Sequence, residues 1–222
     1  MERIFGIDLG TTSVKAILAR SDGRIIATVG RDYKLDYPAP DRCELDPEIY
    51  WQSSRHVIRR LLQESRVAPE RIAAISFSSQ GETVIVVDAQ GRPLRKAIVW
   101  LDNRSGDQAA EIKREFGEEI LRKTGQPEVA PIWPATRLRW LRQHEPRTFA
   151  RARKFLLVED FLIHRLTGRF VSEHTLASST LYFDIARKRW WPAMLDYTGI
   201  TEAQLPELVP SGTGLGPLTS QA

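Results

Sequence analysis

The segment that most constrains the fold is the N-terminal stretch of about thirty residues. An apolar run ends in Asp8, a short polar turn follows, and a segment of alternating residues leads away from it. Alternation with a period of two residues is typical of a β-strand with one buried face. Residues 3–8 and 13–20 are therefore predicted strands, and 23–33 is a third, reached through the turn Ser21-Asp22-Gly23. Together these three strands predict an antiparallel meander.

The polar turn after the first strand has the composition of a phosphate-binding loop. A glycine lets the backbone approach phosphates closely, and N–H groups and hydroxyls in such a turn donate to phosphoryl oxygens. The predicted phosphate-binding residues are Gly10, Thr11, Thr12, Ser13 and Lys15. Asp8, at the strand end, is the predicted metal ligand, because Mg²⁺ prefers oxygen ligands and keeps most of its waters. The alternative is a β-hairpin whose Asp and Thr only satisfy the turn.

The remaining pattern predicts more strands and then helices. Asp46 can cap a helix over residues 47–64, with Pro47 at its first position. Further strands are predicted at 72–77, 83–88 and 97–100, and helices at 105–116, 117–124, 135–144, 158–166 and 187–199. The tail from Pro206 is rich in Gly, Pro, Ser and Thr and is typical of a linker. We expect an α/β fold with a mixed sheet of about five strands and helices on both faces.

Composition excludes several classes of protein. The net charge is +4, and the basic stretch 137–153 alternates with apolar residues, which favours a solvated helix face over a nucleic-acid site. No apolar run approaches the roughly 20 residues of a membrane span, and a signal peptide's apolar region is missing. The single Cys43 excludes an intrachain disulfide and suits a reducing compartment. We therefore expect a cytoplasmic protein without a nucleic-acid or membrane partner.

Five stretches in this order resemble the FGGY carbohydrate kinases, from residue 3 to about residue 217. Besides the phosphate loop, these are Ile75–Thr83, the run Trp100-Leu-Asp102-Asn-Arg104, Asp160–Gly168 and His174–Ile185. The second stretch looks like the loop that presents sugar-binding side chains in this family. In the family's glycerol kinases it carries an Arg-Glu pair. Here Glu82 matches the glutamate, while Gly81 stands where the arginine would be.

The resemblance implies an RNase H-like fold (the actin, Hsp70 and sugar kinase superfamily) with ATP and Mg²⁺ as cofactors. It implies that residues 1–208 form the N-terminal sugar-binding domain and that 209–222 are a truncated interdomain linker. A C-terminal kinase domain, in cis or in trans, would then supply the general base and most of the adenine pocket. The implied contacts to a small sugar or polyol come from Gln80, Glu82, Trp100, Asp102 and Trp133.

Several of these residues have plainer interpretations. Trp100 could be a core residue at a strand end, and Trp133 could be a packing residue between two prolines. Asp102 and Arg104 could form a structural ion pair across a turn. The four histidines show no metal-ligand spacing, so they are interpreted as surface or capping residues.

Three functions compete. The leading one is the N-terminal half of an ATP-dependent pentulose or polyol kinase, inactive alone. It would be xylulokinase-like because Gly81 departs from the glycerol pattern, although the Met-His-Gly triplet of many xylulokinases is missing too. The second is a non-catalytic, sugar- or phosphate-binding regulatory half-protein. The third is a metal-dependent nuclease using Asp8 with Glu82 or Asp102. The near-neutral charge argues against the nuclease, since such enzymes present a basic face to nucleic acid.

Overall fold

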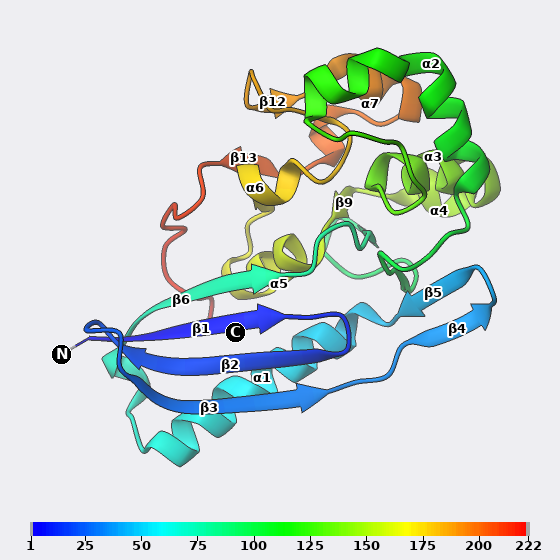
Figure 1. The fold of residues 1–222 in the computed structure, drawn as a ribbon. Coiled ribbons are helices and arrows are strands. Elements are labelled where there is room, and N and C mark those ends of the chain that lie inside the picture. The colour runs from blue at the N-terminus through cyan, green and yellow to red at the C-terminus, as the bar shows by residue number, and fades with distance from the viewer. Residues whose placement is uncertain (1, 221–222) are drawn as a thin grey trace. The chain divides into compact units, whose positions relative to one another are not determined.

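The chain folds into two compact units in a computed structural model that describes residues 2–220 (Figure 1). Unit 1 contains the residues up to Leu35 together with Asp46–Gln80. Unit 2 contains Asp36–Leu45 and the residues from Gly81 onward. The sequence of unit 1 is thus interrupted by a short segment that belongs to unit 2.

Unit 1 is built on a four-stranded sheet with the order β3-β2-β1-β6. The strands are β1 (Arg3–Leu9), β2 (Ser13–Arg20), β3 (Ile25–Asp32) and β6 (Ile72–Ser79). The first three form the predicted antiparallel meander, and β6 adds to β1 in parallel. The sheet is therefore mixed, as predicted. A parallel pair needs a long crossover connection, and the segment from β3 to β6 is long enough to include a helix.

Helix α1 (Pro47–Ser65) covers one face of this sheet. Its predicted start is confirmed, because the Asp46 carboxylate accepts a hydrogen bond from the Glu48 backbone N–H at 3.0 Å. The buried residues of α1, β1 and β2 form the core of unit 1: Tyr50, Trp51, Val57, Leu61, Phe5, Ile7, Leu9, Val14, Ala16 and Leu18. Since side chains alternate along a strand, Asp8 and Lys15 lie on the opposite face of the sheet and are exposed. A one-turn 3₁₀ helix, Pro69–Arg71, precedes β6.

The prediction of five strands in one sheet is wrong. The segments expected to extend the sheet lie in unit 2, where β7 (Ile85–Val87) pairs with β9 (Lys154–Leu156) and β8 (Ala97–Ile98) pairs with β5 (Arg42–Leu45). The other neighbour of β5 is β4 (Asp36–Ala39). A short, fully apolar strand shows by its composition that it is buried, but not which strand it pairs with.

The long helices of unit 2 agree with the sequence pattern. Helix α2 (Gly106–Thr124) contains one non-helical residue, Gly117, with φ 20° and ψ −100°, at the predicted break between two helices. The predicted helices α3 (Pro134–His144) and α5 (Val158–Thr167) form. Helix α7 covers only Pro192–Thr198, because the residues before it form β12.

The smaller elements of unit 2 have weaker sequence signals. They are α4 (Pro146–Arg151), α6 (His174–Ala177), the 3₁₀ helix Glu202–Gln204, and the paired strands β11 (Phe183–Asp184) and β12 (Arg189–Trp190). In the predicted linker, β13 (Glu207–Val209) pairs in parallel with β10 (Val171–Glu173), so the irregular segment begins later than Pro206. From 210 to 220 the described residues contain no helix or strand, and 221–222 of the predicted linker lie outside the described residues.

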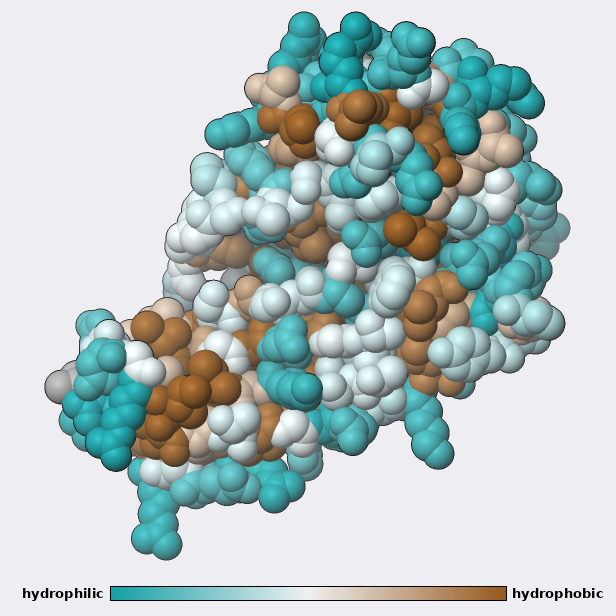
Figure 2. Space-filling view, in the orientation of Figure 1, coloured by the Kyte–Doolittle hydropathy of each residue, from teal (hydrophilic) through white to brown (hydrophobic). Residues whose placement is uncertain are grey.

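The surface of the molecule is mostly polar. On the face drawn in Figure 2, hydrophilic side chains in teal separate the brown hydrophobic patches. Among the described residues, no helix is long and apolar enough to cross a membrane. The exposed large hydrophobic residues include Ile25, Tyr37, Leu121 and Leu218, which are far apart in sequence.

Candidate functional site

The predicted metal ligand and the predicted phosphate-binding lysine lie side by side on unit 1. Asp8 is the next-to-last residue of β1, and its register partner across the antiparallel pair is Lys15. Its partner in the parallel pair is Ser78 of β6. Both charged side chains are exposed, on the face of the sheet that α1 does not cover. The strand pairing thus brings a carboxylate and an ammonium group together beside the turn.

The turn after β1 is closed tightly by backbone hydrogen bonds. The Gly10 N–H donates to the Ser13 carbonyl at 2.9 Å, and the Tyr33 N–H donates to the Thr12 carbonyl at 2.9 Å. A Cβ atom at Gly10 would lie 3.1 Å from the Ser13 carbonyl oxygen, so a larger residue would require the turn to shift slightly. Thr12 is exposed, and Thr11 and Ser13 are partly exposed. Phosphate binding by these residues stays a prediction.

Two side chains that are distant in sequence support the turn through the carbonyl of Gly10. That carbonyl accepts hydrogen bonds from the Tyr33 hydroxyl and from the Gln80 amide, the latter at 2.9 Å. The same Gln80 nitrogen lies 3.3 Å from the Tyr50 hydroxyl, whose ring meets that of Tyr33 edge-on. Burial and the charge of Asp8 raise the pKa of Tyr33, so its hydroxyl stays protonated as a donor.

Sequence reasoning missed Tyr33 and assigned Gln80 only to the sugar. No local pattern marks Tyr33, because it lies 23 residues beyond Gly10 and only the fold brings the two together. The amide of Gln80 supports the phosphate loop, and a contact from Gln80 to a sugar stays a prediction.

The metal site rests on one carboxylate. Among residues 2–220, no group of three or more His, Cys, Asp or Glu residues could hold a metal ion. The exposed Asp8 still fits Mg²⁺, because this ion usually keeps several waters and is held by one or two carboxylates plus substrate phosphates. The donor set therefore suits a hydrated ion that arrives with a nucleotide, and does not suit a permanently bound ion.

Glu82 lies at the start of the second segment of unit 2, and its backbone conformation is uncommon for a residue other than glycine. Its φ of 56° lies in the left-handed region, where residues other than glycine are infrequent and often functional. The residue is half-buried, and its carbonyl accepts a hydrogen bond from Arg137 Nη1 at 2.5 Å. Burial raises the pKa of the Glu82 carboxyl group, while a hydrogen bond from Ser179 and the charge of Arg137 oppose that rise. Glu82 is therefore held in place, unlike a solvated turn residue.

The side chain of Arg137 links three predicted sugar-binding positions. This arginine of α3 is fully buried, and its Nη2 donates to the carbonyls of Trp100 at 2.7 Å and Asp102 at 3.1 Å, in addition to the bond to Glu82. Burial lowers the pKa of Arg137 to about 10, so the group stays charged at neutral pH. The predicted solvated face over 137–153 is wrong for Arg137. Leu141, four residues later, is also buried, and this helical spacing was the available signal.

Asp102 forms the structural ion pair that was the alternative interpretation. Its two carboxylate oxygens accept hydrogen bonds from Arg104 Nε and Nη2, both at 2.8 Å. One oxygen also accepts the Cys43 backbone N–H at 2.6 Å, and Arg104 reaches Glu44 at 2.6 Å. Because Asp102 is fully buried and its oxygens are occupied, these contacts favour a structural role. Sugar binding by Asp102 stays a prediction.

The two predicted tryptophans differ in exposure. Trp100 is partly exposed, and its backbone N–H donates to the Thr83 hydroxyl at 3.1 Å. Trp133 is only 9% exposed, lies in the apolar core of unit 2, and donates through Nε1 to the Glu128 carbonyl at 3.1 Å. Trp133 therefore packs as a core residue, while Trp100 is partly exposed.

The predicted site residues form two sets. Asp8, the phosphate loop and Gln80 lie in unit 1. Glu82, Trp100, Asp102 and Trp133, the other predicted sugar-binding residues, lie in unit 2. In unit 2, Arg137 donates hydrogen bonds to the carbonyls of Glu82, Trp100 and Asp102. Trp133 is not part of this network and donates to the Glu128 carbonyl instead.

Comparison with known proteins decides the family. A model of the "FGGY family of carbohydrate kinases, N-terminal domain" matches residues 3–222. The chain belongs to the FGGY family of carbohydrate kinases. The FGGY domain is 39% identical to a glycerol kinase of Thermococcus gammatolerans over 213 residues, which are 94% of this chain and 43% of that protein. It is 33% identical to a gluconokinase of Bacillus subtilis over 210 residues, covering 94% of this chain and 40% of that protein.

Solved structures agree. The FGGY domain superposes on a ligand-bound xylulose kinase from Lactobacillus acidophilus with a TM-score of 0.93 and 30% identity, covering 99% of this chain and 44% of that one. The family resemblance inferred from the five stretches is confirmed. The chain spans less than half the length of these relatives, and their names cover three different substrates.

Proposed function

We propose that this FGGY domain is the N-terminal half of an ATP-dependent kinase that phosphorylates a hydroxyl of a pentulose or polyol. The observation that carries the proposal is the phosphate loop, whose Gly10 carbonyl is held by Tyr33 and Gln80. These two contacts hold the loop in place, and N–H groups and hydroxyls on a loop held in this way can stabilise the charge of a transferring phosphoryl group. The antiparallel meander with a parallel fourth strand and a covering helix supports the finer assignment to the RNase H-like fold.

Unit 1 would position the phosphates. Phosphoryl transfer needs charge neutralisation, in-line placement of the hydroxyl and a carboxylate that takes its proton. When MgATP is bound, the metal neutralises charge on the phosphoryl oxygens. Asp8 would hold the waters of that ion, and Lys15 would add a positive charge. The N–H groups and hydroxyls of Thr11, Thr12 and Ser13 would donate to the phosphates.

Unit 2 would bind the sugar. The carboxylate of Glu82 would accept hydrogen bonds from sugar hydroxyls, and the exposed part of Trp100 would lie against the C–H face of the sugar. Gln80, Asp102 and Trp133 complete the proposed set with weaker support, since each has the structural contact described above. A Cβ atom at Gly81 would lie 3.2 Å from the Ser179 hydroxyl, so an arginine there would need that side chain to shift slightly. The replacement of the glycerol-pattern arginine by Gly81 favours a pentulose over glycerol.

The proposed division of the chain follows its relatives. Residues 1–208 would form the sugar-binding domain, and 209–222 would lead toward a C-terminal domain, in cis or in trans, that carries the general base and the adenine pocket. The coverage of about 43% of a relative's length supports a missing second half. We also propose a cytoplasmic location, which the free, buried Cys43 supports.

An ADP-release assay tests the function on the longer protein that contains this sequence. We expect turnover with a pentulose or polyol from a panel of xylulose, ribulose, glycerol and gluconate. Asp8→Asn should lower kcat far more than it changes the KM for the sugar, because it removes a charge beside the phosphates and no sugar contact. If calorimetry detects sugar binding while no member of the panel is phosphorylated, the non-catalytic regulatory half-protein is correct instead.

A further inference from the structure

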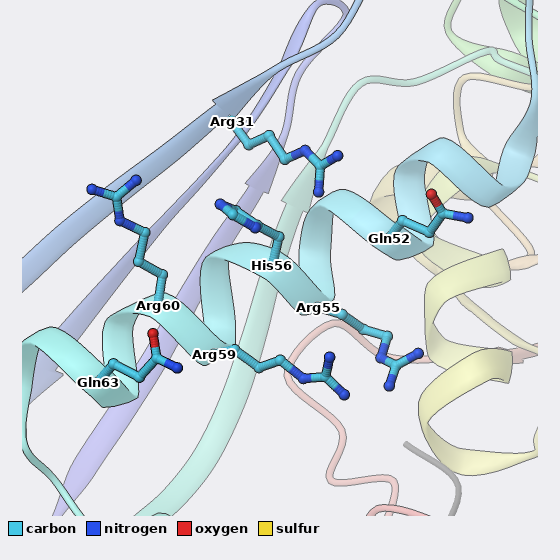
Figure 3. A pocket seen from close by; sticks show the side chains of 7 residues that line it. All are labelled: Arg31, Gln52, Arg55, His56, Arg59, Arg60 and Gln63. Carbon is cyan, nitrogen blue, oxygen red and sulfur yellow. The ribbon is translucent and has the colours of Figure 1, made fainter.

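A second positively charged surface lies on α1, on residues that the proposed kinase chemistry does not use. A hollow of about 370 Å³ there is lined by Arg31 of β3 and by Arg55, Arg59 and Arg60 of α1. Gln52, His56 and Gln63 complete its lining, and Figure 3 shows the Arg31 side chain extending from β3 toward α1. We call these seven residues the α1 hollow.

The α1 hollow lies on the opposite face of the sheet from Asp8 and Lys15. Arg31 is paired in register with Val14, whose side chain points to the buried face that α1 covers. Lys15, the next residue of that strand, points the other way, to the face of Asp8. Because residues alternate along a strand, the Arg31 side chain lies on the face that α1 covers, whereas Asp8 and Lys15 lie on the other face.

The arrangement on the helix follows helical spacing. Gln52, His56, Arg59 and Gln63 are separated by four, three and four residues, so they form one stripe along the helix, flanked by Arg55 and Arg60. All are exposed except Arg55, which is partly buried. This stripe lies opposite the apolar stripe that packs on the sheet, and its charge serves no packing purpose.

The positive charge of the α1 hollow is mostly uncompensated. Arg60 pairs with Glu64 at 2.7 Å, and the Arg55 guanidinium lies 5.6 Å from the Trp51 ring centre. Within the described part of the chain, neither Arg31 nor Arg59 has a carboxylate within 4.0 Å. Like charges four residues apart, as Arg55 and Arg59 are, destabilise a helix. A bound anion would relieve that repulsion.

We propose that the α1 hollow binds a small molecule that carries two or more phosphoryl groups. Guanidinium groups form paired hydrogen bonds with phosphate oxygens, and those of Arg55 and Arg59, which extend to the same side of α1 in Figure 3, suit two phosphoryl groups. The volume lies within the usual range of small-ligand sites, about 300–1,000 Å³. Gln52 and Gln63, at the two ends of the stripe, offer amides that both donate to and accept from hydroxyls. The proposal is independent of the proposed kinase function.

Calorimetry with tripolyphosphate, pyrophosphate and inorganic phosphate tests the proposal on the 222-residue chain. EDTA in the buffer suppresses metal-dependent binding at Asp8. We expect tripolyphosphate to bind at least tenfold more tightly than inorganic phosphate. Arg55→Gln/Arg59→Gln should weaken that binding at least tenfold. The matched control is Lys113→Gln/Arg114→Gln, which removes two exposed charges from the middle of α2 and should change the affinity less than twofold.

Backbone amide shifts measured by NMR locate the binding. Shifts over residues 52–63 support the α1 hollow, whereas shifts confined to residues 8–15 overturn it. Equal weakening by both double variants would show that tripolyphosphate binds only through general charge attraction, and the proposal would be wrong. If a glutamate-rich peptide or an RNA of matched charge binds the α1 hollow more tightly than tripolyphosphate, the surface docks a macromolecule and the proposal is wrong. Should the double variant unfold, Arg31→Gln replaces it, since this exposed residue on the edge strand β3 leaves the helix unchanged.

Discussion

The proposed sugar site depends most on the carboxyl group of Glu82. A hydrogen bond to a charged group contributes roughly 1.5–3 kcal/mol. Glu82→Ala should therefore weaken sugar binding by about one to two orders of magnitude, at ~1.4 kcal/mol per tenfold. Thermal stability should change little, because the side chain is only half-buried. Calorimetry on this chain, or KM in the longer protein, measures the effect.

Acidification provides a check on the same residue. Only the ionised carboxylate accepts hydrogen bonds through both oxygens, and burial raises the pKa of Glu82. Sugar affinity should therefore begin to fall at a higher pH than for an ordinary glutamate. Glu115→Ala, at an exposed position of α2, serves as a control for lost charge. Unchanged sugar affinity in Glu82→Ala would place the pocket elsewhere.

Asp160 gives the FGGY domain a pH-dependent stability. It is 2% exposed and accepts the Leu157 N–H at 2.8 Å, and burial raises its pKa to about 7. The folded state thus binds a proton that the unfolded state releases near its ordinary value of 3.8. This contribution to stability is complete below about pH 4 and is lost as the pH rises through about 7.

Asp160→Asn should remove that dependence. The asparagine oxygen can still accept the Leu157 N–H, and the variant never buries a charge. Its melting temperature relative to the parent should rise between pH 4 and 7 and then level off. A relative gain of about ten degrees is expected above pH 7, since a shift of about three pKa units corresponds to roughly 4 kcal/mol and each kcal/mol to about 2–4 °C. An offset that stays constant from pH 4 to 8 would contradict the assignment.

At the scale of elements, Arg137 connects α3 to the loops after β6 and β8. Arg137→Met keeps the side-chain volume but leaves three backbone carbonyls without this donor. Each buried, unsatisfied group costs about 1–3 kcal/mol, so the variant should lose about 3 kcal/mol or more. Urea denaturation measures the loss. Arg142→Met, at an exposed position of the same helix, should change stability by less than about 0.5 kcal/mol.

Elements with a local signal were predictable from the sequence, and elements defined by distant partners were not. The meander follows from alternation and from a turn of three residues, and α1 follows from Asp46 and Pro47 at its start. Strand β5 has no such signal, because its pairing partner Ile98 lies 54 residues after Glu44. Arg137 was misjudged for a related reason. Arginine is usually exposed, and its burial here depends on carbonyls from other segments.

The candidate site divides in the same way. The phosphate loop is one continuous run, so its composition was enough to find it. Its support by Tyr33 and Gln80 needed the folded sheet. The pattern also named Asp102, but could not show that Arg104 and Cys43 occupy its oxygens.

At the scale of the whole molecule, the 222-residue chain alone should show negligible kinase turnover. A general base contributes typically about 10²–10⁴-fold to rate, and the proposed source of that base is a C-terminal domain. We expect sugar binding without ADP release above background. Adding the C-terminal half as a separate polypeptide should restore activity if the halves associate. Turnover near the usual ~1–100 s⁻¹ for kinases from this chain alone would show that a carboxylate within it serves as the base.

The interrupted sequence of unit 1 has a consequence for the order of folding during synthesis. Every residue of unit 1 has been made once Gln80 is added, but the inserted segment 36–45 must wait for β8. Until then Cys43, which is 1% exposed in the finished chain, lacks the neighbouring strand β8 and the Asp102 carboxylate. The solvent accessibility of the Cys43 thiol should therefore fall when unit 2 folds, both during synthesis on the ribosome and during refolding.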